Sequence, residues 1–289
     1  MILSDFLLRE TVNLQCSTFG IDHALITQDK AHFLDYPHSV DYQFNSRGFR
    51  DEEWPESHKE LQQAIWCVGD SFTVGIGSPY NHIWPNVLQQ LTNQRVINVS
   101  LSGASNSWIA RKIVRIANEI APANIIALWS FFHRRESSDT SKSDEDRRIH
   151  QHNTSDEEDS DNFKSCVDNA TSNLSSSNLL HFTIPSAHLR YDLVLSWNNI
   201  RDKEWPTLPP KTLLEFDSLP EFIKLEINQK FNLTGPFRLL LQKNELFAVY
   251  KNQKNIIEIP RLDLARDAQH FGYATSSWLA DSIIPRLTI

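Results

Sequence analysis

Short, continuous apolar runs recur along the chain and predict buried β-strands. The clearest are Ala64–Val68, Arg95–Val99, Asn124–Trp129 and Leu179–Ile184. Within these runs apolar residues follow one another instead of alternating with polar ones, as expected of strands that are covered on both faces. The pattern therefore predicts a sheet in the interior of the protein.

Between and after these runs, apolar residues recur every three or four positions, which predicts amphipathic helices. One helix is expected over Ile83–Leu91, a second over Trp108–Ile120, and a third near the C-terminus over Ser276–Ile284. Strands and helices that alternate in this way favour parallel pairing with right-handed crossovers. We therefore expect an α/β fold with a parallel sheet.

Two segments lack this regular pattern. We interpret residues 1–60 as an N-terminal arm that packs on a main domain of residues 61–289, with a turn at Asn45–Arg50. Residues 136 to about 178 are rich in Ser, Asp, Glu and Asn, and we interpret them as a solvated, partly mobile, inserted loop region. Phe163, Cys166 and Val167 are expected to anchor one helical turn within it.

The remaining part of the chain, between this acidic excursion and the last helix, shows only short patterns. The expected elements are strands at Tyr191–Trp197, Phe247–Tyr250 and Ile256–Ile259, and a helical piece around Leu219–Phe231. No internal repeat is present.

Composition and charge narrow the functional classes. The 289 residues are 40% hydrophobic and 22% charged, which allows a sizeable core. The formal net charge is -8 and no basic stripe occurs, so a nucleic-acid partner is not expected. The three cysteines show no disulfide or metal-binding spacing. No signal peptide or membrane-spanning stretch is apparent, which favours a soluble protein made in the cytoplasm.

The first candidate for chemistry is Ser71, which lies directly after the strand Ala64–Val68 and the turn residues Gly69 and Asp70. Ligands of open α/β sheets bind at the carboxyl ends of the strands. A serine that begins a helix there can act as a nucleophile, because helix amides stabilise developing negative charge. The simpler alternative is that Ser71 only caps a turn.

The second candidate lies just before the last helix, where Asp267 precedes His270 by three residues. A carboxylate on one imidazole nitrogen fixes the tautomer, and the other nitrogen can then accept a proton from a serine. The simpler alternative is a salt bridge within a loop, since the chain has 11 histidines.

Taken together, Gly69-Asp70-Ser71-Phe72, the loop with Gly103 and Asp267-x-x-His270 resemble the SGNH (GDSL-type) hydrolase superfamily. The sequence around these residues looks like that of SGNH-like proteins from bacteriophages and marine microbes. This resemblance implies a three-layer α/β/α sandwich with a flavodoxin-like parallel sheet. It further implies Ser71 as nucleophile, His270 as base and Asp267 as the residue that orients the imidazole.

The resemblance also implies an oxyanion hole made by the backbone amides of Ser71 and Gly103. In one respect the chain departs from the family, because Phe131 stands where an Asn would complete that hole. Asn106, from the Gly103 loop, is the expected substitute, with its side chain directed toward Ser71. His133 and Arg134 are further candidates for lining the pocket, although each is more readily explained as structural.

The implied activity is that of a metal-independent serine esterase or acetylesterase without a cofactor. Its substrate would be a small-molecule or carbohydrate ester. Trp84, Trp108 and Phe271 would suit a sugar ring if they lay at the rim, but aromatic residues at such spacing are more often part of the core. The alternative is a structural or carbohydrate-binding protein of the same fold with little or no activity, such as a phage particle component, which would associate with a virion. Oligomeric state and substrate are not readable from the sequence.

Overall fold

The computed structural model describes residues 13–16, 40–139, 141–142, 148–150, 156–174, 176–184, 195–196, 213–215, 221, 224, 237–242, 245–250, 256–260, 262–267 and 269–288. Its centre is a five-stranded sheet in the order β13-β8-β5-β3-β4, in which all neighbouring strands are parallel. The strands are β3 (Ile65–Gly69), β4 (Val96–Ser100), β5 (Asn124–Trp129), β8 (Asn178–Thr183) and β13 (Ile256–Glu258). The four apolar runs are therefore four of its five strands.

Counted along the chain, these strands lie in the order 2-1-3-4-5, which is the order of flavodoxin-like sheets. The predicted α/β fold class is confirmed. The direction in which the chain adds strands reverses between β3 and β5. In open α/β sheets, ligands bind beyond the carboxyl ends of the strands at this reversal. The segments that follow β3 and β5 both begin there.

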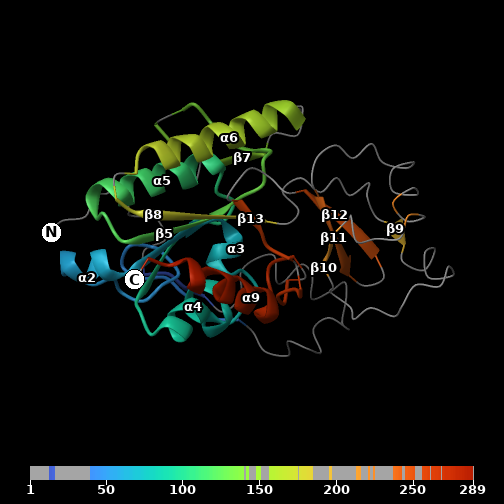
Figure 1. The fold of residues 1–289 in the computed structure, drawn as a ribbon. Coiled ribbons are helices and arrows are strands. Elements are labelled where there is room, and N and C mark those ends of the chain that lie inside the picture. The colour runs from blue at the N-terminus through green and yellow to red at the C-terminus, as the bar shows by residue number, and fades with distance from the viewer. Residues whose placement is uncertain are drawn as a thin grey trace.

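Helices cover both faces of the sheet and make three layers (Figure 1). On one face lie α5 (Asn106–Glu119) and α6 (Asp156–Ser172), and on the other α4 (Trp84–Thr92) and α9 (Tyr273–Ile283). Because side chains alternate across a strand, Trp66 packs toward the first pair of helices and Cys67 toward the second. Every residue of β3, β4 and β5 is buried, which explains why these runs contain so few polar positions.

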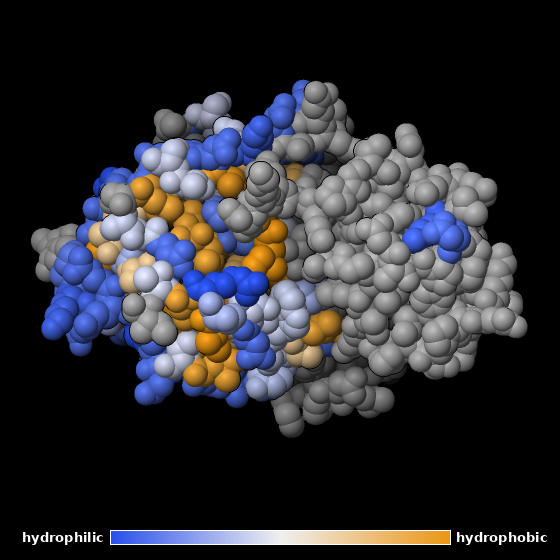
Figure 2. Space-filling view, in the orientation of Figure 1, coloured by the Kyte–Doolittle hydropathy of each residue, from blue (hydrophilic) through white to orange (hydrophobic). Residues whose placement is uncertain are grey.

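Helix α6 is longer than the single turn expected for this region. Phe163, Cys166, Val167 and Ala170 are buried against the core at the i, i+3, i+4, i+7 spacing of an amphipathic helix. Phe163 stacks on Phe132 with ring centroids 3.9 Å apart. Hydrophilic side chains cover the outside of α6 (Figure 2). Glu158 and Asp161 are exposed on this helix, so part of the predicted excursion is a structural helix with acidic residues on its solvent face.

The described part of the N-terminal arm packs on the main sheet. Strand β2 (Tyr42–Gln43) pairs with β1 (Gln15–Cys16), and α2 (His58–Gln63) leads into β3. Between them Asp51 is buried, and its Oδ2 accepts a hydrogen bond of 3.0 Å from the backbone N–H of Asn98 on β4. Several side chains within 40–63, including those of Phe49, Asp51 and Leu61, are thus buried against the core, whereas the division at residue 60 remains a prediction.

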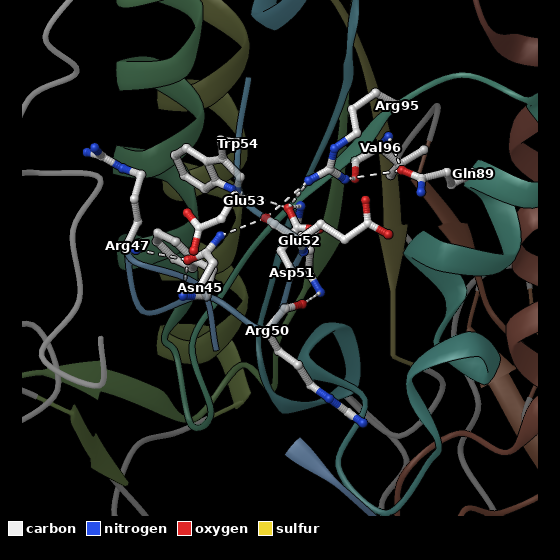
Figure 3. A network of polar contacts seen from close by, with 12 residues as sticks. Asn45, Arg47, Arg50, Asp51, Glu52, Glu53, Trp54, Gln89, Arg95 and Val96 are labelled. Carbon is white, nitrogen blue, oxygen red and sulfur yellow. Dashed lines mark hydrogen bonds and ion pairs between the residues drawn. The ribbon is translucent and has the colours of Figure 1, made fainter. Parts of the chain in front are cut away.

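Figure 3 shows the polar network around Asp51. Its carboxylate also accepts a hydrogen bond of 3.0 Å from Trp54 Nε1 and forms an ion pair of 2.9 Å with Arg95. Burial raises the pKa of Asp51 to about 6, although Arg95 and the hydrogen bonds oppose this change. The Asp51 carboxylate therefore links the arm to β4, although its removal from water opposes folding.

The remaining elements are short, and much of the region between β8 and β13 lies outside the described residues. A second, antiparallel sheet has the order β10-β11-β12-β9. Its strands are β9 (Leu195–Ser196), β10 (Leu213–Glu215), β11 (Phe237–Gln242) and β12 (Glu245–Tyr250), and β6 (Arg134–Glu136) pairs with β7 (Arg148–His150) elsewhere. The short helices are α3 (Ser71–Val74), η3 (Tyr80–His82) and η6 (Ile284–Arg286).

Of the shorter predicted patterns, strands occur at β12, at β13 and, for the expected strand Tyr191–Trp197, at β9 alone. The helical piece expected around Leu219–Phe231 falls outside the described residues except at positions 221 and 224. Among the helices that the structure describes, none combines the length and the apolar character needed to cross a bilayer.

Candidate active site

Ser71 is placed by a sharp turn between β3 and α3. A Cβ atom on Gly69 would lie 2.0 Å from Thr73 Oγ1, so the turn requires a glycine. Asp70 caps the helix, with its Oδ1 accepting a hydrogen bond of 3.0 Å from the backbone N–H of Phe72. Ser71 is the first residue of α3 and is 4% exposed. It therefore lies at the carboxyl end of β3, as expected from the sequence.

The loop that follows α3 contacts the loop that carries Asp267. The backbone N–H of Arg266 donates to the carbonyl of Gly77 at 3.0 Å, and Ser78 Oγ donates to the carbonyl of Phe271 at 3.0 Å. A Cβ atom on Gly77 would lie 3.0 Å from the carboxylate carbon of Asp267. The two segments are separated by about 190 residues in sequence but are held together by direct contacts.

Asp267 and His270 form the predicted contact. Asp267 is fully buried, and its Oδ2 is hydrogen-bonded to His270 Nδ1. Its Oδ1 accepts hydrogen bonds of 3.0 Å from the backbone N–H groups of Gln269 and His270. Burial alone would raise the pKa of Asp267, but the hydrogen bonds and charge of His270 outweigh burial and hold that pKa below its usual value. The carboxylate thus keeps the proton of the imidazole on Nδ1 and leaves Nε2 as an acceptor.

The imidazole of His270 lies beside α3. Its ring centroid is 4.6 Å from that of Phe72, the residue after Ser71. Within the described part of the chain, neither Ser71 Oγ nor His270 Nε2 makes a hydrogen bond, so the two are not bonded to each other. Catalytic hydrogen bonds are often long in enzymes without substrate. The structure therefore forms the Asp267–His270 pair near Ser71, and the complete triad remains a prediction.

The predicted oxyanion donors Ser71 and Gly103 lie at the ends of adjacent strands. The backbone N–H of Leu101, which follows β4, donates to the carbonyl of Gly69 at 3.1 Å and holds the two ends together. Gly103 has a φ of 78°, a left-handed conformation that favours glycine. Among the residues described, neither the Ser71 nor the Gly103 N–H donates a hydrogen bond, so both remain available to a ligand.

Asn106 is the first residue of α5, directly after the N-cap Ser105, and its side chain is fully buried. Its Oδ1 accepts a hydrogen bond of 2.7 Å from the backbone N–H of Ser130. Its Nδ2 donates to the carbonyls of Ser130 at 3.2 Å and Phe131 at 3.4 Å. These contacts anchor the loop after β5 and compete with the role expected for Asn106 in the oxyanion hole, which remains a prediction.

Sequence reasoning missed a buried cluster directly beside Ser71. The Oδ2 atom of Asp70 accepts hydrogen bonds of 2.6 Å from both Ser130 Oγ and Arg134 Nη1. Arg134 Nη1 also donates to Ser130 Oγ at 2.8 Å. Asp70 was interpreted only as a turn residue, and the 64 positions between it and Arg134 leave no local signal for the ion pair.

A second missed contact comes from the N-terminal arm. Arg50 is fully buried and donates to the carbonyls of Val74 at 3.0 Å, Gly75 at 2.5 Å and Ser78 at 2.8 Å. Its guanidinium carbon lies 4.3 Å from the ring centroid of Tyr42. Burial lowers the pKa of Arg50 to about 10, which leaves it charged at neutral pH. Arg50 therefore holds the loop that in turn contacts Asp267.

The aromatic residues considered for a sugar-binding rim are in the core. Trp84 is 0% exposed, Trp108 is 1% exposed and Phe271 is 3% exposed. They pack against the sheet in the two apolar clusters that flank it. These three side chains therefore belong to the core, the simpler of the two interpretations, and do not line an open rim. In the described ranges, no group of three His, Cys, Asp or Glu side chains is arranged to hold a metal ion.

No protein-family model matches the chain, and no curated protein matches it. Solved structures do resemble it at low sequence identity. A protein assigned to the G-D-S-L lipolytic family from Desulfitobacterium hafniense DCB-2 is 16% identical over 78% of this chain and 99% of its own, with a TM-score of 0.37. TesA is 13% identical over 77% and 97%, with a TM-score of 0.37. A GDSL-like lipase from Bacteroides thetaiotaomicron VPI-5482 is 11% identical over 81% and 92%, with a TM-score of 0.35.

Proposed function

We propose that this protein is a serine esterase of the SGNH type that hydrolyses carboxylic esters. The observation that carries the proposal is the buried Asp267–His270 pair, which lies beside the helix that begins at Ser71. A simple salt bridge at the surface would not explain why the Asp267 carboxylate is fully buried and accepts three hydrogen bonds. The site also lies beyond the carboxyl ends of the strands, where ligands of such sheets bind.

In the proposed reaction, Ser71 Oγ attacks the ester carbonyl while His270 Nε2 takes the hydroxyl proton. The tetrahedral intermediate collapses when His270 gives that proton to the leaving alcohol, and the acyl group stays on Ser71. Water then attacks the acyl carbonyl, and His270 takes a proton from the water. The bond between the acyl carbon and Ser71 Oγ breaks, His270 returns the proton to Oγ, and the carboxylic acid is released. Asp267 holds the imidazole in the required tautomer and stabilises it when protonated.

A short acyl group is the proposed substrate feature, since Ser71 is 4% exposed and His270 is 6% exposed. Both side chains are therefore mostly covered, which favours a small acyl group. Acetyl esters, including those on carbohydrates, carry such a short acyl group and are the proposed substrates. The burial of Trp84 and Trp108 removes the argument that these rings bind a sugar.

A serine-directed fluorophosphonate provides the test. We expect it to label the protein at Ser71, and we expect Ser71→Ala to abolish both labelling and hydrolysis of p-nitrophenyl acetate while the fold is retained. Ser172→Ala, on the exposed side of α6, is the matched control and should behave like the unmodified protein. Absence of labelling and turnover in the unmodified protein would replace the esterase proposal with a structural or carbohydrate-binding role.

A further inference from the structure

We propose that Arg134 donates to the oxyanion in place of the side-chain amide that Phe131 lacks. This inference rests on the proposed esterase function, because the oxyanion is that of the ester tetrahedral intermediate.

The chain folds back after β5 and brings Arg134 over Phe131. The backbone N–H of Arg134 donates to the carbonyl of Phe131 at 3.2 Å, and its guanidinium carbon lies 4.8 Å from the centroid of that ring. The ring of Phe131 in turn meets that of Phe72 edge-on, with centroids 6.0 Å apart. The guanidinium thus lies on the side chain that replaced the amide, next to the helix of Ser71.

Two hydrogen bonds fix the orientation of the guanidinium. Nη1 donates to Asp70 Oδ2 at 2.6 Å and to Ser130 Oγ at 2.8 Å. Asp70 directly precedes Ser71 and caps the same helix through its other oxygen. The position of Arg134 is therefore tied to the residue that also sets the position of the nucleophile.

The other edge of the guanidinium has no hydrogen-bond partner among the residues that the structure describes. Nε is buried and makes no hydrogen bond, and Nη2 makes none with any residue that the structure describes. These two nitrogens point their N–H groups to the same side and form the fork with which arginine binds oxygen anions. Arg134 is 9% exposed, and its unpartnered Nε is buried. A buried donor without an acceptor in the described residues is open to a ligand that brings one.

The charges are arranged as a preorganised donor requires. Asp70 neutralises Arg134, which allows the arginine to be buried without a net charge. The pair is then a fixed dipole whose positive side is the unpartnered fork. Such a dipole stabilises an oxyanion without reorganising during the reaction.

The test is Arg134→Lys, which keeps the positive charge beside Asp70 but removes the fork. We expect kcat on p-nitrophenyl acetate to fall by about 100- to 1000-fold, the loss typical of one oxyanion donor, with little change in KM. Inhibition by phenylboronic acid, which forms a tetrahedral adduct on serine, should weaken in parallel. Arg135→Lys, one position away on β6, is the matched control and should keep both values. Thermal unfolding of each variant reports on the fold.

A second variant separates a donor from a structural ion pair. Adding Phe131→Asn to Arg134→Lys restores an amide where the family places one, and we expect it to recover at least tenfold of the lost kcat. Labelling at Ser71 with unchanged kcat in Arg134→Lys would overturn the role of Arg134 and leave the esterase standing. Loss of kcat without loss of boronate affinity would also overturn it. Absence of labelling in the unmodified protein would refute the esterase itself, and the inference with it.

Discussion

Acid should destabilise this protein through one buried histidine in the central sheet. His181 on β8 is 9% exposed, and burial lowers its pKa to about 4. Its Nδ1 accepts a hydrogen bond of 3.1 Å from Trp129 Nε1 on the neighbouring strand, and the two rings are stacked. The neutral imidazole is therefore the form that fits the fold, because a proton on Nδ1 would remove the acceptor.

The size of the effect follows from linkage between protonation and folding. An unfolded histidine has a pKa of about 6.5, so between about pH 6.5 and pH 4 the unfolded chain binds a proton that the folded chain does not. The stabilisation that neutral His181 provides is complete above about pH 6.5 and is lost as the pH falls to about 4. Between pH 7 and pH 4.5, this loss amounts to about 2 kcal/mol in the free energy of unfolding.

Urea unfolding of the unmodified protein and of His181→Asn at these two pH values measures the effect. Asparagine can present its Oδ1 to Trp129 but does not titrate, so the pH-dependent loss should be about 2 kcal/mol smaller in the variant. His82→Asn, at a half-buried histidine near the surface, is the control. Equal pH dependence in the unmodified protein and His181→Asn would refute the reasoning.

Two further predictions concern the site. Asp267→Asn should lower kcat by up to about 10,000-fold, because the imidazole is no longer held in the required tautomer, while the melting temperature changes little. If the variant is instead largely unfolded at the assay temperature, Asp267 is mainly structural. Arg50→Met should lower the free energy of unfolding by at least about 2 kcal/mol, because three buried carbonyls lose their charged donor. Arg47→Met, on the same turn, is the control. Equal stability of the two variants in urea would contradict the structural role of Arg50.

The central sheet could be predicted from the sequence because burial on both faces leaves a continuous apolar run. The helices α4, α5 and α9 were predictable because each packs one face on the sheet, which leaves apolar residues at every third or fourth position. Helix α6 was underestimated, because the acidic residues before Phe163 dominate the composition of the segment while only every third or fourth position is apolar. The amino-acid composition of such a helix mainly reflects its solvent face, whereas the spacing of its few apolar residues reveals the face that packs on the core.

At the site, the predictable contact was the local one. Asp267 and His270 are three residues apart, so a single loop turn brings their side chains together. The ion pair between Asp70 and Arg134 and the contact between Arg50 and Gly75 depend on how distant segments meet. No periodicity or spacing encodes such contacts, and a single sequence shows only that polar residues are present.

The burial of Arg50 and Asp51 limits how far the chain can be shortened for biochemical work. A protein that began at residue 61 would match the sequence-based boundary but would lose both side chains. The carbonyls of Val74, Gly75 and Ser78 and the N–H of Asn98 would then lack their partners. We expect such a fragment to aggregate on expression, and a usable minimal protein should start before residue 40.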